Sequence, residues 1–172
     1  NDSDTAWECV KSLTEPSCVI VKHANPCGVC SAKTTKEAYL GAFSTDITSA
    51  FGGIIAINKE IDLETAELII KQFVEVIIAP SYSKEAKDIF KSKVNIRLLQ
   101  IKINKLDDQL DFKKIGGGWL VQTSDVVKID INKCEIVTKL KPNIKQLKDL
   151  HFAWKVAKYV KSNAIIFCKD MK

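Results

Sequence analysis

The sequence predicts an α/β protein, a three-layer α/β/α sandwich built around a mainly parallel, mixed sheet. Short apolar runs rich in β-branched residues, which are typical of buried strands, alternate with longer segments whose apolar residues recur at helical spacing. Polar residues that can cap a helix precede several of these longer segments. With 172 residues and 46% apolar content, the chain can bury one sizeable core. This alternation favours helices on both faces of one sheet.

Each expected element depends on a local signal. The Asn-Asp-Ser-Asp cluster at the N-terminus can supply the cap of the first helix, and Thr34 and Glu37 form a capping-box pattern before the second. Asp62 can cap the third helix. The predicted helices span about residues 4–13, 34–43, 62–72, 83–90 and 143–160. The predicted strands span about residues 18–21, 52–57, 74–79, 96–101, 119–122 and 164–168.

The segment between the predicted strands at 96–101 and 119–122 lacks the apolar periodicity of the rest of the chain. Residues 102–115 are polar and show no periodicity, which indicates a surface excursion. Gly116–Gly118 is not surrounded by a P-loop or dinucleotide fingerprint, so a turn into the strand at 119–122 is the better interpretation.

Composition and charge narrow the class of protein. The net charge of +5 arises from 26 basic and 21 acidic residues, and the lysines are scattered, which argues against nucleic-acid binding. No apolar run approaches the roughly 20 residues of a membrane span, and the first residues are unlike a signal peptide. We therefore expect a cytoplasmic protein with reduced cysteines. Because the chain begins at Asn1 and an apolar run ends just before Lys172, we also expect it to be an internal fragment.

Polar residues at strand ends are the first candidates for chemistry, because open α/β sheets bind ligands beyond the carboxyl ends of their strands. Lys22 and His23 follow the apolar run 18–21. A histidine titrates near neutral pH and can transfer protons, while a lysine can stabilise a developing anion. The alternative is structural, with Lys22 extending its ammonium to solvent and His23 capping the strand.

Two further positions stand out beside apolar strands. Ser49–Gly53 ends in two glycines ahead of a strand, where the backbone can approach a ligand closely. Glu75 is a carboxylate within a nearly apolar run, so we expect it to have a partner or a ligand.

A zinc-dependent deaminase is a competing hypothesis. Pro26, Cys27 and Cys30 fit the P-C-x-x-C half of the zinc nucleobase deaminase signature, and His23 lies just upstream. The other half of that signature is H-x-E, and here Asn25 occupies the position of the general acid/base Glu. The histidine also directly precedes the cysteines instead of coming from a separate element. We therefore expect no zinc.

Four motifs in order resemble the AICAR transformylase half of the bifunctional purine biosynthesis enzyme family. They are Val21-Lys22-His23-Ala24-Asn25-Pro26-Cys27-Gly28, Ser49-Ala50-Phe51-Gly52-Gly53-Ile54-Ile55-Ala56, Glu75-Val76-Ile77-Ile78-Ala79-Pro80 and Lys161-Ser162-Asn163-Ala164-Ile165. Gly117-Gly118-Trp119-Leu120-Val121-Gln122 also agrees, so the resemblance covers nearly the whole chain. The family implies a cytidine-deaminase-like fold without zinc, and shared architecture would then account for the deaminase-like cysteines.

The resemblance implies a formyl transfer from 10-formyltetrahydrofolate to the 5-amino group of AICAR, in the synthesis of IMP. By similarity, His23 is the proton acceptor and Lys22 stabilises the transition state. Gly52, Glu75 and Asn163 match nucleotide-contacting positions, although some relatives have Asp in place of Glu75, and Phe51 matches a folate-contacting position.

The family also implies the parts that this chain lacks. Residues 1–172 are expected to be a partial transformylase domain, comprising the first cytidine-deaminase-like subdomain and the beginning of the next part of that domain. The IMP cyclohydrolase domain and the C-terminal transformylase part are expected elsewhere, with the site completed in a homodimer. The fragment alone is therefore expected to be inactive. Besides the deaminase, the remaining alternative is a noncatalytic α/β scaffold piece.

Overall fold

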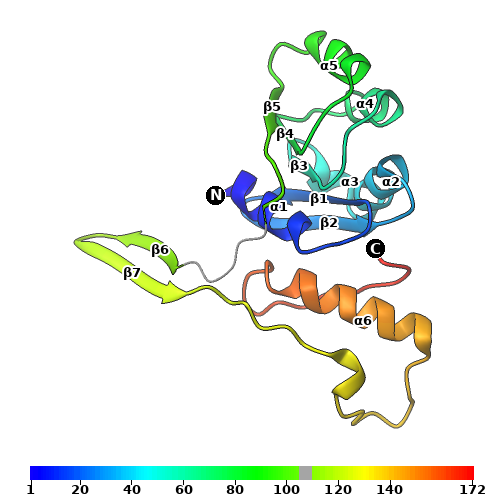
Figure 1. Ribbon diagram of the computed structural model, residues 1–172, viewed down its shortest axis with the longest axis vertical. Coiled ribbons are helices and arrows are strands. Elements are labelled where there is room, and N and C mark those ends of the chain that lie inside the picture. The colour runs from blue at the N-terminus through cyan, green and yellow to red at the C-terminus, as the bar shows by residue number, and fades with distance from the viewer. Residues whose placement is uncertain (105–109) are drawn as a thin grey trace. The chain divides into compact units, whose positions relative to one another are not determined.

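The computed structural model describes residues 1–104 and 110–172 and separates into two compact units (Figure 1). The first unit comprises Asn1–Ile103 and Thr138–Lys172, and the second comprises Asn104–Val137. All the candidate site residues lie in the first unit.

The first unit contains the helices and the larger sheet. Its helices are α1 Asp2–Lys11, α2 Thr35–Thr45, α3 Ile47–Ala50, α4 Leu63–Ile69, α5 Lys84–Lys91 and α6 Ile144–Ala157. Its strands are β1 Ser17–Lys22, β2 Asn25–Ser31, β3 Ile54–Ile57, β4 Val76–Ala79 and β5 Arg97–Gln100. The second unit contains β6 Leu110–Ile115, β7 Gly118–Thr123 and the 3-10 turn Ile131–Lys133. The predicted capping box of α2 is present, with Thr34 and Glu37 as its two members.

The sheet of the first unit is mixed, with strand order β2-β1-β3-β4-β5. β3 pairs in parallel with β4, and β4 with β5, whereas β1 is antiparallel to both β2 and β3. Four of the five strands therefore run in the same direction, which confirms the mainly parallel, mixed sheet. The exception is β1, the strand predicted at 18–21. It is joined to β2 by a tight hairpin and runs antiparallel to both of its neighbours.

β2 was not predicted from the sequence. Pro26 and Gly28 lie within it, and both residue types are unfavourable in a central strand. β2 occupies the edge of the sheet, where proline is tolerated because no further strand needs its missing N–H.

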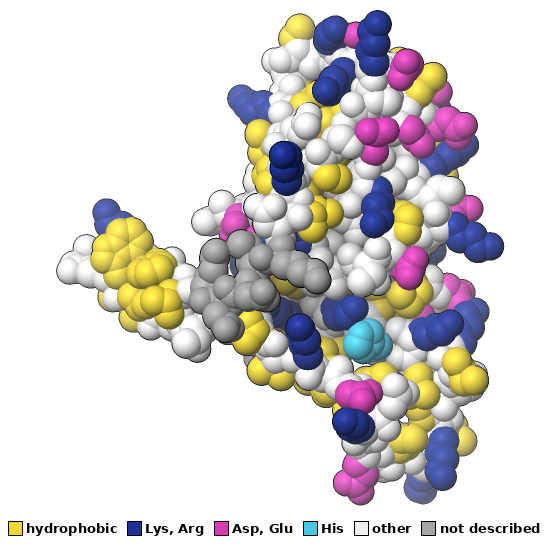
Figure 2. Space-filling model, in the orientation of Figure 1, with side chains coloured by type: hydrophobic (Ala, Val, Ile, Leu, Met, Phe, Trp, Pro, Cys, Tyr) yellow, Lys and Arg dark blue, Asp and Glu magenta, His cyan; other side chains and the backbone are white. Residues whose placement is uncertain are grey.

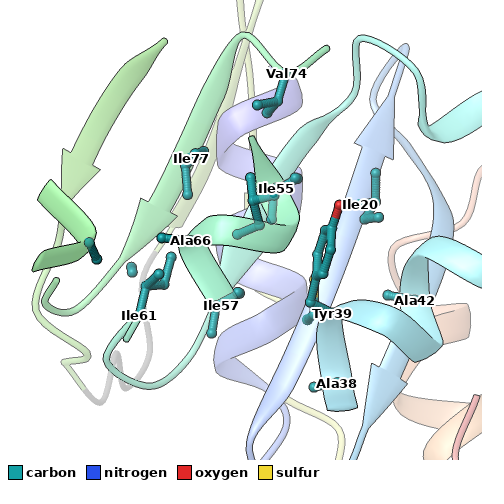
Figure 3. Close-up of a cluster of buried hydrophobic side chains, with 14 of the residues drawn as sticks. Ile20, Ala38, Tyr39, Ala42, Ile55, Ile57, Ile61, Ala66, Val74 and Ile77 are labelled. Atoms are coloured by element: carbon teal, nitrogen blue, oxygen red, sulfur yellow. The ribbon is translucent and has the colours of Figure 1, made fainter. Parts of the chain in front are cut away.

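Alternate residues along the strands face two separate apolar cores. Ile20, Ile55 and Ile77 pack with residues of α2, α4 and α5 on one face, as Figure 3 shows for Tyr39, Ala42 and Ala66. The opposite face buries the strand residues Val19, Val21, Ala56 and Ile78 against Val10 of α1 and Phe152 of α6. Helices therefore cover both faces of the sheet, and the three-layer α/β/α architecture is confirmed.

The strand predicted at 164–168 is absent. Among the described residues this segment pairs with no strand, and Ile165 and Phe167 are 78% and 93% exposed. Ile166 and Cys168 pack against the core beneath α1 and α6. This packing accounts for the apolar residues of the segment, although the segment forms no β-ladder hydrogen bonds with any described strand. An apolar run alone cannot specify a strand, since a strand also needs a partner edge.

The second unit contains an amphipathic hairpin. β6 and β7 pair antiparallel, which confirms the turn at the glycines and the strand after it. Residues 110–115, expected as part of a surface excursion, form β6 instead, and residues 105–109 of that excursion lie outside the described residues. The register brings Phe112 opposite Val121 and gives one face of the hairpin four large apolar side chains, Leu110, Phe112, Trp119 and Val121. Figure 2 shows hydrophobic side chains gathered over this hairpin.

Asn58, just after β3, joins β3 to the segment before β1 and is only 2% exposed. Its Oδ1 accepts from the Ser17 amide at 2.9 Å, and its Nδ2 donates to the carbonyls of Leu13 and Glu15 at 2.9 and 2.8 Å. Asn58→Ala removes these three side-chain hydrogen bonds and leaves their buried backbone partners unsatisfied. It is therefore expected to lower the free energy of unfolding by about 2 kcal/mol, measured by urea unfolding. The exposed Asn95→Ala serves as the control, and equal stability of the two variants would contradict this assignment.

Candidate functional site

The predicted site residues gather at one end of the sheet. Lys22 ends β1 and His23 follows it, while Phe51 and Gly52 precede β3 and Glu75 precedes β4. Only Lys22 and His23 therefore lie at the carboxyl end of a strand. Because β1 is antiparallel to β3, its carboxyl end adjoins the amino ends of β3 and β4. The rule that directed attention to carboxyl ends thus applies to β1 alone.

His23 lies in the two-residue turn between β1 and β2, where Lys22 pairs with Asn25. His23 and Ala24 have φ angles of 55° and 53°, as both central residues of a type I′ turn require. A non-glycine residue in this conformation costs roughly 1–2 kcal/mol. The ladder also shifts at Cys27, an irregularity that re-aims the adjacent strand end. His23 is exposed at this strained turn.

The segment after α6 contacts the same turn. The backbone N–H of Lys161 donates to Asn25 Oδ1 at 3.1 Å, and Lys161 Nζ donates to the His23 carbonyl at 2.6 Å. Asn163, two residues further along, is exposed. The last sequence motif is therefore brought beside the first.

Lys22 is tied to the loop before β3. Its Nζ donates to the Phe51 carbonyl at 2.8 Å, which orients the ammonium toward this end of the sheet. Gly52 has φ of 72°, a conformation that favours glycine, and its N–H donates to the Phe73 carbonyl at 3.0 Å. The rings of Phe51 and Phe73 lie 5.3 Å apart between centroids, and they are 61% and 48% exposed. Together they present an exposed aromatic surface beside Lys22.

Glu75 is exposed, so solvent can satisfy its carboxylate without a protein partner, and its binding of a ligand stays a prediction. The residue lies one position before β4 begins, and its backbone carbonyl accepts from the Arg97 N–H at 2.9 Å. The Glu75 side chain therefore needs no buried partner. If Glu75 binds a ligand, it does so because it lies next to the loop that contains Gly52.

The cysteines of the deaminase-like motif pack into the protein. Cys30 is buried in the core beneath α2, and Cys27 packs against that core and donates to the Ile20 carbonyl at 3.5 Å. Burial raises the pKa of both thiols, whereas zinc ligation requires thiolates. Within residues 1–104 and 110–172, no three or more His, Cys, Asp or Glu side chains are grouped as metal ligands. That zinc is absent from the protein stays a prediction.

A hollow in the surface lies away from these residues. Residues of α5, the following loop and β5 line it; they are Lys87, Phe90, Lys91, Lys93, Val94, Ile96 and Leu98. None of the candidate site residues contributes to it.

Three participants were not predicted from the sequence: Asn25, Lys161 and Phe73. Asn25 and Lys161 each lie inside a motif that had been identified, but their hydrogen bond joins residues 136 positions apart. Phe73 falls between the predicted helix at 62–72 and the predicted strand at 74–79, and its place just ahead of an apolar strand was the one signal for it.

The fold and the gathered residues define an α/β protein with a cationic and aromatic surface at one end of its sheet. The family model described as "AICARFT/IMPCHase bienzyme" matches residues 1–172, the whole chain. The chain belongs to the AICARFT/IMPCHase family, that of a bifunctional enzyme of purine biosynthesis.

Solved structures show more distant similarity. The dCMP deaminase of the cyanophage S-TIM5 has 9% identity and a TM-score of 0.45, with 58% of this chain and 94% of that chain covered. RibD of Acinetobacter baumannii, in two crystal forms, has 16% identity and a TM-score of 0.42, with 56% of this chain and 32% of that chain covered. The described residues include no helix long and apolar enough to cross a membrane.

Proposed function

We propose that this chain contributes to formyl transfer from 10-formyltetrahydrofolate to the 5-amino group of AICAR. The observation that carries the proposal is the meeting of Lys22, His23 and Phe51 at one end of the sheet in a chain matched throughout by the family. A histidine provides a proton acceptor, a lysine provides a fixed positive charge, and an aromatic ring provides a stacking surface.

The reaction needs help chiefly with proton removal. The amino group of AICAR is conjugated with the neighbouring carboxamide and is a poor nucleophile. As its nitrogen bonds to the formyl carbon, the bond from that carbon to N10 of the folate breaks, and N10 gains a proton to give tetrahydrofolate. His23 accepts the proton lost by the amine, acting through the carboxamide. Lys22 stabilises the negative charge that develops on the formyl oxygen.

The remaining predicted residues have binding roles in this proposal. Gly52 offers a backbone that a nucleotide can approach closely, and Asn163 and Glu75 offer hydrogen-bonding side chains. Phe51 packs against the folate, whose ring system is flat and apolar on its faces. No metal is required for any of these steps.

We further propose that the chain acts within a larger protein. Lys22, His23, Phe51, Gly52 and Glu75 lie at one open end of the sheet, and pockets for ligands of this size enclose most of the ligand surface. We therefore expect the cyclohydrolase domain and the second transformylase part in the complete cytoplasmic enzyme, which is a homodimer.

The test compares the 172-residue chain with the complete enzyme. We expect formyl transfer from 10-formyltetrahydrofolate to AICAR in the complete enzyme. We expect none above background in the chain alone, because the chain supplies only part of the pocket that must enclose the two ligands. Elemental analysis of both preparations is expected to show no stoichiometric zinc. A complete enzyme that lacks formyl transfer, or that deaminates nucleobases with about one zinc per chain, would refute the proposal.

A further inference from the structure

The turn that carries His23 is strained, and it contains no glycine. Both of its central residues have positive φ, a conformation that L-residues adopt only when the surrounding structure holds them there. The antiparallel pairing of β1 and β2 fixes the two ends of the turn but leaves its central peptide groups to be held by other contacts. The position of His23 therefore depends on what contacts the turn from outside the hairpin.

Lys161 contacts the turn on both sides of its strained centre. Its Nζ donates to the carbonyl of His23 at 2.6 Å, and its backbone N–H donates to the side chain of Asn25 at 3.1 Å. The two contacts come from one residue and reach positions immediately before and after Ala24. They form a clamp, by which we mean Asn25 and Lys161 together.

We propose that Asn25 and Lys161 are positioning residues that hold the His23 turn in its reactive conformation. Neither needs to touch a substrate. The direction of the His23 side chain is set by the backbone of the turn, and misplacement of a reacting group by about 1 Å can cost about 100-fold in rate. Because Lys161 lies two residues before Asn163, the clamp also links the proposed nucleotide-binding segment to the proposed proton acceptor. The inference rests on the proposed function.

The clamp is tested first by kinetics of the complete enzyme. Asn25→Ala removes the acceptor of the Lys161 N–H, and Lys161→Met removes the Nζ donor. Each is expected to lower kcat by about 10- to 100-fold and to change the KM for AICAR by less than about threefold. Asn25→Asp retains an acceptor oxygen and Lys161→Arg retains a donor, so both are expected to stay within about threefold of parental kcat. The exposed Lys148→Met on α6 is the matched control.

A second measurement reports the turn without relying on catalysis. In the 172-residue chain, backbone order parameters of His23 and Ala24 are expected near 0.85, falling below about 0.6 in Asn25→Ala. If the complete enzyme performs no formyl transfer, the proposed function fails, but these order parameters still test the clamp. Unchanged order parameters, or equal losses of kcat in Asn25→Ala and Asn25→Asp, would overturn it.

A compensating substitution keeps the test decisive if Asn25→Ala disturbs folding. Glycine adopts positive φ without a side-chain clash, so Ala24→Gly relieves half of the strained turn. Added to Asn25→Ala, it is expected to recover kcat about tenfold, provided that the clamp acts by holding this conformation. No recovery in a folded double variant would contradict the inference.

Discussion

Replacing His23 with alanine in the complete enzyme is expected to lower kcat about 10²- to 10⁴-fold, with a much smaller change in nucleotide affinity. The reason is that a proton acceptor contributes mainly in the transition state. Lys22→Ala is expected to lower kcat as well, because the ammonium that the Phe51 carbonyl orients would be lost. Steady-state kinetics, normalised to the folded fraction from thermal melts, provide the measurement.

The other histidine of the chain supplies a matched control. His151 lies on α6 and is half-buried, away from the strained turn, so His151→Ala is expected to keep parental turnover per folded molecule. If His23 had only a structural role, stability would fall by about 1 kcal/mol while turnover stayed nearly unchanged. A His23→Ala enzyme with more than about a tenth of parental kcat is inconsistent with general-base catalysis by this residue.

Gly28→Ala is expected to have the largest effect on stability, about 4 kcal/mol. β2 and α2 approach so closely at this position that an added Cβ would lie 2.1 Å from the Ala42 carbonyl oxygen and 3.0 Å from its carbon. Both atoms belong to the helix backbone, so relief requires moving α2 away from the edge of the sheet. For a domain of this size, the melting temperature is expected to fall by roughly 8–16 °C.

Gly117→Ala provides the comparison for this substitution. No atom beyond the neighbouring residues lies within 4 Å of the corresponding position, and the backbone of Gly117 is outside the left-handed region. Its unfolding free energy is expected to stay within about 0.5 kcal/mol of the parent. A melting temperature of Gly28→Ala equal to that of Gly117→Ala would show that α2 packs less tightly on β2 than the structure describes.

Local signals in the sequence predicted much of this fold. The Thr34 and Glu37 capping box depends on residues three positions apart, and the buried strands at β3 and β4 depend on short apolar runs, so a linear pattern suffices for them. β2 and the segment 164–168 were mispredicted for opposite reasons. β2 contains proline and glycine but lies at an edge that tolerates them, whereas 164–168 is apolar but has no partner edge.

The candidate site shows the same division between local and long-range information. Motifs of a few residues located Lys22, His23 and Phe51, because those residues adjoin strands that are themselves predictable. The orientation of β1 was not predictable from its composition, so the carboxyl-end rule identified the correct end of the sheet for only one of its strands. The contact of Lys161 with Asn25 depends on how α6 packs, which no local pattern encodes.

The same contact implies an order of events during folding. The β1–β2 hairpin joins residues close in sequence and can form within microseconds, whereas the Lys161 contact closes a loop of 136 residues. The entropic cost of closing a loop rises with the length of the loop. The hairpin therefore forms before α6 and the segment that follows α6 pack onto it. During synthesis, β1 and β2 could therefore pair once both have left the ribosome, and His23 would acquire its final orientation only after residue 161 has been added.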